Sequence, residues 1–107
     1  MKRVIYLVTV LALSVAASPI HAQGSPQTGL VLAQQVCSEC HAIRRGQVPL
    51  LNSKAPTFGE LAATPGTTTT ALLVAPTTPH AGMPMFIFTA EQRENVIAYI
   101  LSQKEGN

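Results

Sequence analysis

Two cysteines and a neighbouring histidine have a spacing that is typical of cofactor chemistry. They stand in the run Cys37-Ser38-Glu39-Cys40-His41. Two thiols one helical turn apart can each form a thioether with a vinyl group of haem, and the adjacent imidazole then lies beneath the ring and binds the iron. Because both tethers hold the ring against His41, such a haem cannot dissociate. The motif therefore predicts covalent haem attachment through Cys37 and Cys40, with His41 as an iron ligand.

Other interpretations of the same residues remain open. A thioredoxin-like redox pair needs a βαβ setting, for which the sequence shows no pattern. A disulfide between the two cysteines is compatible with an exported protein. A Cys₂His₂ zinc site would use Cys37, Cys40, His41 and His80. The secretory N-terminus, the helical pattern and a distant methionine-containing loop favour haem.

The N-terminal segment, residues 1–22, has the pattern of a secretory signal peptide. Positive charge at Lys2 and Arg3 precedes a mostly apolar run and a small-residue cleavage context that ends at Ala22. The apolar run is shorter than the roughly 18 residues of a membrane span, so we expect cleavage rather than a retained anchor. In a bacterium this signal directs the protein to the periplasm, and residues 23–107 form the mature domain.

The composition excludes several classes of protein. A hydrophobic content of 47% is too high for a disordered chain. Seven Lys and Arg against five acidic residues are not the basic footprint of a nucleic-acid-binding protein. Asp is absent and no acid–base pair for catalysis is apparent. Because Lys2 and Arg3 belong to the leader, the mature chain is formally neutral, which predicts weak electrostatic steering toward a partner.

The mature chain is expected to be all-α with long loops. A first helix is predicted to have Thr28 as its cap and to reach Cys37, after a loose polar leader at residues 23–27. Two stretches, residues 42–55 and 76–88, contain Pro and Gly without a clear period and are expected to be irregular.

Capping signals predict the remaining helices. Thr57 with Glu60 and Thr89 with Gln92 form capping boxes, and residues 71–75 are expected to form a further short helix. The last helix has one apolar face, composed of Val96, Ile97, Ile100 and Leu101. A chain of this size with no Trp has a marginal core, which an apolar cofactor would supplement.

Over residues 28–104 the chain resembles the small class I c-type cytochromes of the bacterial periplasm. Gly29 has the place of a small residue that packs on the C-terminal helix in that family. Met83-Pro84 resembles the loop that carries the axial methionine, and Tyr99 resembles the aromatic residue that crosses the first helix. The resemblance implies three to five helices wrapped around one covalently bound haem, in an electron-transfer protein rather than an enzyme.

The resemblance also implies the second iron ligand. The family places its axial methionine directly before a proline, which assigns Met83, with Met85 and His80 as the alternatives. A thioether ligand raises the reduction potential relative to two imidazoles. With both axial positions filled, no site remains for oxygen or peroxide, which favours electron transfer.

Further residues around the haem follow from the same resemblance. In the family a proline carbonyl accepts the N–H of the proximal imidazole, and Pro56 resembles that residue, with Pro49 as the alternative. Phe58 and Phe86 are expected to line the haem pocket, although core packing explains them equally well.

The expected function is that of a one-electron carrier that cycles between Fe(III) and Fe(II) and connects periplasmic or membrane redox partners. A haem c subunit of a multi-subunit periplasmic dehydrogenase or oxidase is the alternative, and a haem-free zinc or thiol-redox module is a third possibility. Neither nucleic-acid binding nor stable membrane insertion after signal cleavage is expected. Arg44 and Arg45 are candidates for contact with a haem propionate or a partner, with a solvated surface pair as the alternative.

Overall fold

The computed structural model of the chain describes residues 24–77 and 82–104. Their regular elements are the helices α1 (Pro26–Val36), α2 (Phe58–Ala63), α3 (Thr69–Val74) and α4 (Ala90–Ser102), with a 3₁₀ turn η1 (Ala75–Thr77). No β-strand occurs in these residues, so the predicted all-α class is confirmed. Every helix among them is too short or too polar to span a membrane. The predicted signal peptide and His80 lie outside the described residues.

Helix α1 begins earlier than predicted. Ser25 is its N-cap and accepts a hydrogen bond from the Thr28 N–H at 3.2 Å, while Pro26 occupies the first turn, where its fixed φ suits a helix. The Ser25 N–H donates to Asn95 Oδ1 at 2.7 Å. The predicted cap at Thr28 is therefore wrong, and so is the predicted loose leader over the described part of residues 23–27. The Ser-Pro pair starts the helix, and a distant amide anchors it.

Both predicted capping boxes are confirmed. Thr57 Oγ1 accepts the Glu60 N–H at 3.0 Å, and the Glu60 carboxylate accepts the Thr57 N–H at 2.7 Å, which starts α2. At the start of α4 the same exchange joins Thr89 and Gln92 at 3.1 and 2.9 Å. Each box satisfies two backbone donors that a helix start would otherwise leave unpaired.

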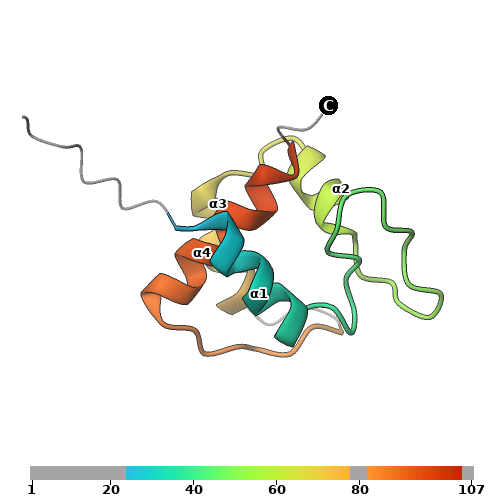
Figure 1. Ribbon diagram of the computed structural model, residues 1–107, viewed down its shortest axis with the longest axis horizontal. Coiled ribbons are helices and arrows are strands. Elements are labelled where there is room, and N and C mark those ends of the chain that lie inside the picture. Colours follow the sequence, from blue (N-terminus) through green and yellow to red (C-terminus); the bar gives the residue numbers. More distant parts are fainter. Residues whose placement is uncertain (1–23, 78–81, 105–107) are drawn as a thin grey trace, which may run out of the picture.

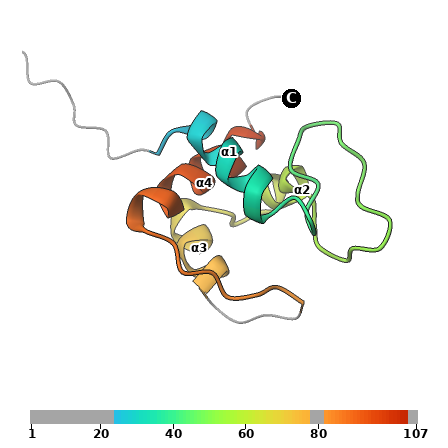
Figure 2. The same ribbon diagram turned by 60° about the horizontal axis from the view of Figure 1, so that its bottom comes forward.

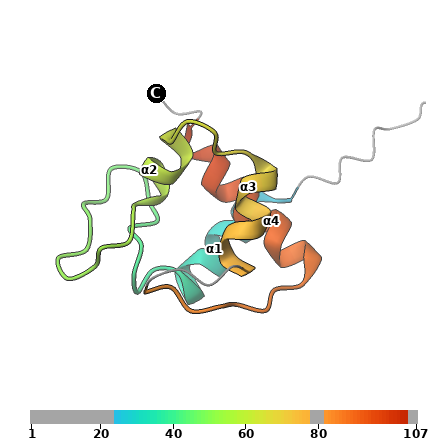
Figure 3. The same ribbon diagram turned by 180° about the vertical axis from the view of Figure 1, so that it is seen from behind.

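The second short helix is displaced from its predicted position. Thr68 is its N-cap and accepts the Ala71 N–H at 3.2 Å, so α3 starts before residue 71. Pro76 lies within η1. Residues 42–55 contain no helix, as expected. The predicted irregular stretch 76–88 begins within η1, so the prediction is wrong there, and its remaining described part, residues 82–88, contains no helix. The long loop after α1 projects to one side of the helices, green in Figures 1 and 3.

Helices α1 and α4 cross at the most extensive helix–helix contact of the described residues (Figure 1). Gly29 of α1 lies buried at this crossing. A Cβ placed on Gly29 would collide with the backbone carbonyl of Asn95 and would lie 2.8 Å from Tyr99 Cβ. The crossing therefore requires a residue without a side chain, which confirms the role expected of Gly29.

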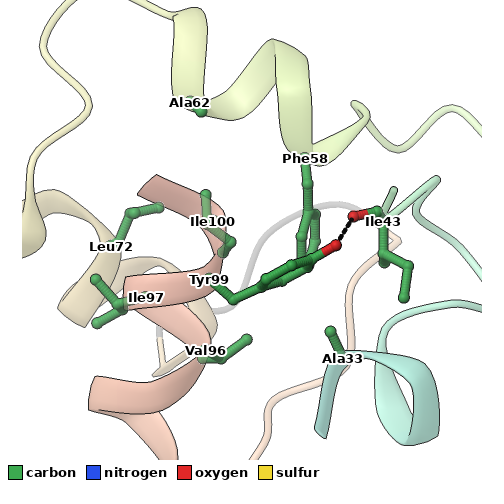
Figure 4. Packing of buried hydrophobic residues seen from close by; sticks show 9 residues of the cluster. All are labelled: Ala33, Ile43, Phe58, Ala62, Leu72, Val96, Ile97, Tyr99 and Ile100. Atoms are coloured by element: carbon green, nitrogen blue, oxygen red, sulfur yellow. Dashed lines mark hydrogen bonds between the residues drawn. The ribbon is translucent and has the colours of Figure 1, made fainter. Parts of the chain in front are cut away.

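The hydrophobic core lies between α4 and the elements that surround it (Figure 4). Its buried members are Ala33, Ile43, Phe58, Ala62, Leu72, Val96, Ile97, Tyr99 and Ile100. Tyr99 reaches from α4 toward the chain that follows α1, and its hydroxyl donates to the Ile43 carbonyl at 2.7 Å. The Phe58 and Tyr99 rings lie 6.1 Å apart between centroids. The core therefore ties α4 directly to the segment that follows His41.

Replacement of Gly29 by Ala tests the helix crossing. We expect the free energy of unfolding to fall by about 1–3 kcal/mol, because a methyl group here forces the two backbones apart. The matched control is Gly59→Ala in α2, where an added Cβ lies 3.8 Å from the nearest atom, Thr57 Oγ1. That control should leave stability unchanged or raise it by up to about 1 kcal/mol. Equal denaturation midpoints for the two variants would contradict the close approach.

Replacement of Tyr99 by Phe tests the bond to Ile43. We expect a loss of about 1–3 kcal/mol at neutral pH, because the buried carbonyl then lacks its donor. Burial raises the pKa of Tyr99 above its usual value of 10.0, an effect that the charges of Arg44 and Arg45 partly oppose. The stability that Tyr99 contributes is thus complete below pH 10 and is lost as the pH rises toward the higher pKa of the folded state. Urea denaturation of the wild type and of Tyr99→Phe should show a difference in stability at neutral pH that shrinks at alkaline pH. A difference that stays constant with pH would refute this explanation.

Candidate functional site

A cavity of about 1080 Å³ opens beside the C-terminal end of α1. Its volume lies just above the range of about 300–1,000 Å³ that is usual for small-molecule and cofactor sites. Figure 2 shows two of the segments that supply its walls, the green loop after α1 and the orange segment before α4. The cavity brings together residues that the sequence singled out: Cys37, Cys40, His41, Pro56, Met83 and Phe86.

The cysteine motif forms a turn that continues from α1. Cys37 is the C-cap of the helix, and its carbonyl accepts the N–H groups of Cys40 at 3.1 Å and His41 at 2.9 Å. The Ser38 hydroxyl donates to the Gln34 carbonyl at 2.7 Å, which further joins the motif to α1. The two thiols therefore stand one turn apart with the imidazole next to them, which is the local geometry that two thioether bonds require.

His41 is buried and its orientation is set by a backbone carbonyl. Nδ1 lies 2.6 Å from the carbonyl oxygen of Pro56, and because that oxygen can only accept, Nδ1 carries the proton. The lone pair of Nε2 is then left for a metal. A metal-binding histidine commonly donates its other N–H to such a carbonyl, which fixes the ring and makes the ligand more basic. Pro49, the alternative acceptor, lines the cavity without accepting this bond.

The phenylalanines predicted for the pocket have different positions. Phe86 lines the cavity and stacks on Phe88, with ring centroids 5.3 Å apart. Phe58 is only 3% exposed and belongs to the core, where its ring lies 5.5 Å from that of His41. Phe58 is not part of the cavity wall, and its contact with the ring of His41 helps to fix the imidazole.

Of the three residues considered as the second ligand, Met83 is placed at the cavity. Its side chain is half-buried and lines the wall together with Gly82 and Pro84. Met85 is 61% exposed and is not part of the wall. His80 lies outside the described residues.

The cavity walls suit an apolar ring held by soft and imidazole ligands. Val48 and Leu51 line the cavity and yet are 76% and 101% exposed, so the wall has apolar side chains available for contact. Two thiols, one imidazole nitrogen and one thioether match the attachment and ligation chemistry of haem. The residues present therefore fit haem. Sequence reasoning missed Val48 and Leu51, because an irregular loop has no periodicity that marks its inner face.

Arg44 and Arg45 do not line the large cavity. They contribute to a separate cavity of about 240 Å³ beside the C-terminal end of α4, together with Gln103 and Lys104. One Arg45 amino group donates to the Ser102 carbonyl at 3.0 Å, where a cation stabilises the negative end of the helix. Their geometry therefore favours a role at the end of α4 over contact with a haem propionate.

The haem-free interpretations receive little support from the geometry. The two cysteines are not joined to each other. Burial raises the pKa of the Cys37 thiol to about 11, whereas reactive thiols have lowered pKa values. Across residues 24–77 and 82–104, no three His, Cys, Asp or Glu side chains gather to hold a metal ion. His80, the fourth ligand of the zinc interpretation, is not among these residues.

Comparison with known families agrees with this geometry. The family model described as Cytochrome c matches residues 27–104, from the first turn of α1 to the residues after α4. No curated protein and no solved structure gives a significant match. The matched stretch contains the complete Cys37–His41 motif, and haem bound covalently through two such cysteines defines the family. The chain is thus a member of the cytochrome c family with covalently bound haem c, and its helices form the cytochrome c fold.

Proposed function

We propose that the protein is a one-electron carrier whose haem is attached through Cys37 and Cys40 and is ligated by His41 and Met83. The bound haem supplies an iron that alternates between the ferric and ferrous states. The observation that carries the proposal is the cavity, whose wall contains all four side chains although Met83 is far from the motif in sequence.

The residues on the histidine side would bind and orient the cofactor. Cys37 and Cys40 would hold two edges of the ring, and the hydrogen bond from His41 Nδ1 to Pro56 keeps the imidazole in one tautomer and one orientation. A ligand held in this way changes little in geometry when its metal gains or loses an electron. Such rigidity suits rapid electron transfer.

Met83 would complete the ligation on the other side. Pro84 follows it directly and restricts the backbone, which lowers the entropy cost of holding a weak thioether ligand in place. Two protein ligands on the iron leave no open position for oxygen or peroxide. This arrangement supports electron transfer rather than catalysis.

The proposed location is the periplasm, with export directed by the signal-like residues 1–22. Partners are proposed to be an electron donor and an electron acceptor that bind transiently near the cavity. Among the described residues of the cavity wall, Glu39 and Lys54 carry the charges, and His41 is the proposed iron ligand. Because Glu39 and Lys54 balance, the wall supports docking with little electrostatic steering. Permanent association with a larger dehydrogenase or oxidase is the alternative, and co-purification with that enzyme would reveal it.

Replacement of Met83 by Ala tests the second ligand. The protein is produced in a host that attaches haem, and absorption spectra are recorded in the oxidised and reduced states. We expect the wild type to have a c-type ferrous spectrum and a weak ferric charge-transfer band that Met83→Ala removes. Met85→Ala is the matched control and should keep the band, because Met85 is exposed and lies off the cavity wall. Loss of the band in Met85→Ala alone would assign the ligand to Met85, and absence of haem bands from the wild type would refute the proposal.

The salt dependence of electron transfer tests the neutral docking surface. Oxidation of the ferrous protein is measured with hexacyanoferrate(III) and with a cationic cobalt(III) complex. We expect both rates to change by less than about tenfold between low and high salt, the smallest effect typical of steered association. In Lys54→Glu, salt should change the oxidation rates with the two oxidants in opposite directions. Lys104→Glu makes the same change of charge away from the cavity, and its rates should depend less on salt. Strong and opposite salt effects in the wild type would contradict a neutral surface.

A further inference from the structure

Three hydrogen bonds pair the segment before α2 with the end of the cysteine motif. They run from Ser53 Oγ to the Cys40 carbonyl at 2.5 Å, from His41 Nδ1 to the Pro56 carbonyl at 2.6 Å, and from the Phe58 N–H to the Ala42 carbonyl at 3.0 Å. The bond that orients His41 is the middle one. Its acceptor is therefore fixed by the bonds on either side.

Ser53 makes the first of these links with a hydroxyl that both donates and accepts a hydrogen bond. Oγ donates to the Cys40 carbonyl and accepts the Ala55 N–H at 3.1 Å. In the part of the chain that the structure describes, no other hydrogen bond joins residues 48–55 to another segment. Most of this loop is exposed, so Ser53 is its main anchor to the motif.

The position of the Pro56 carbonyl depends on its neighbours. A proline has no N–H, so Pro56 cannot fix itself through a backbone bond of its own. On one side Ala55 is held by Ser53, and on the other side Thr57 is held by Glu60 and Phe58 by Ala42. Removal of the Ser53 hydroxyl would free one of these two sides.

We propose that Ser53 is a positioning residue for His41: by joining the Cys40 carbonyl to the Ala55 N–H, it holds the Pro56 carbonyl against His41 Nδ1. The inference rests on the proposed role of His41 as an iron ligand. A carbonyl held close to Nδ1–H makes the imidazole a stronger electron donor, which favours ferric iron. Ser53 therefore lowers the reduction potential of the haem without touching it.

The test compares Ser53→Ala with Ser53→Thr, which retains the hydroxyl, and with Ser102→Ala. Ser102 also donates its hydroxyl to a backbone carbonyl, that of Tyr99 at 2.6 Å, and it does not line the large cavity, so it is a matched control away from the cysteine motif. Each variant is purified with haem attached, and its midpoint potential is measured by redox titration. We expect Ser53→Ala to raise the ferrous-to-ferric ratio at a fixed potential by about two- to tenfold, the equivalent of part or all of one hydrogen bond. Ser53→Thr and Ser102→Ala should stay close to the wild type.

A second measurement follows the hydrogen bond itself. NMR of the ferrous protein gives the rate at which His41 Nδ1–H exchanges with solvent, and we expect faster exchange in Ser53→Ala only. If Ser53→Ala does not accumulate, Ser53→Val replaces it, because Val has nearly the shape of Thr without the hydroxyl.

The outcomes distinguish a failure of the role proposed for Ser53 from a failure of the proposed function. Unchanged potential and unchanged exchange in the variants without a hydroxyl would overturn the role of Ser53, and so would a change that Ser53→Thr shares. A wild-type protein without a c-type spectrum would contradict the proposed function instead, and that result is obtained before any variant is compared.

Discussion

The close approach of α1 and α4 at Gly29 is the contact on which the haem-binding segment depends. It places the C-terminal end of α1, and with it Cys37, in a defined position relative to α4. Tyr99 then reaches across from α4 and holds the Ile43 carbonyl, so the chain is fixed just beyond His41 as well. The cysteine motif is thus restrained at both ends by one helix that contributes no residue to the large cavity. The packed helices α1 and α4 thus hold the short cysteine motif in a fixed position.

The described hydrogen bonds on the two sides of the haem site differ in length. On the histidine side, short hydrogen bonds connect Ser53, Pro56 and the motif at 2.5–2.6 Å. The segment that carries Met83 is joined to its surroundings by longer bonds, from the Phe86 N–H to the Pro76 carbonyl at 3.4 Å and from Arg93 to the Phe88 carbonyl at 3.5 Å. Among the described residues, the proposed ligand His41 therefore lies in a segment with short hydrogen bonds, and Met83, the proposed second ligand, lies in a segment with longer ones. Bonds to the iron and packing on an apolar ring would contribute more to the order of the methionine side.

Phe58 links the protein core to the cofactor site. Phe58 packs on Tyr99 in the core and on His41 at the cavity, while Val48 and Leu51 present apolar surface to the cavity itself. In a small chain such contacts are a large part of the available hydrophobic stabilisation. Phe58 thus contributes both to the stability of the fold and to the orientation of His41, the proposed iron ligand.

The sequence by itself determined the features whose interacting residues lie within a few positions of each other. The capping boxes at Thr57 and Thr89 and the Cys37–His41 motif were predicted correctly because their partners are at most four residues apart. The start of α1 was predicted wrongly, since it depends on Ser25 and on a bond to Asn95, 70 residues away. The resemblance predicted Pro56 as the acceptor of the imidazole N–H, with Pro49 as the alternative, and the tertiary structure decided between them. Only the tertiary structure decided that Phe58 belongs to the core and that Ser53 anchors the loop. These roles depend on how an aperiodic loop folds back on the motif, and contacts between distant segments leave no pattern in a single sequence.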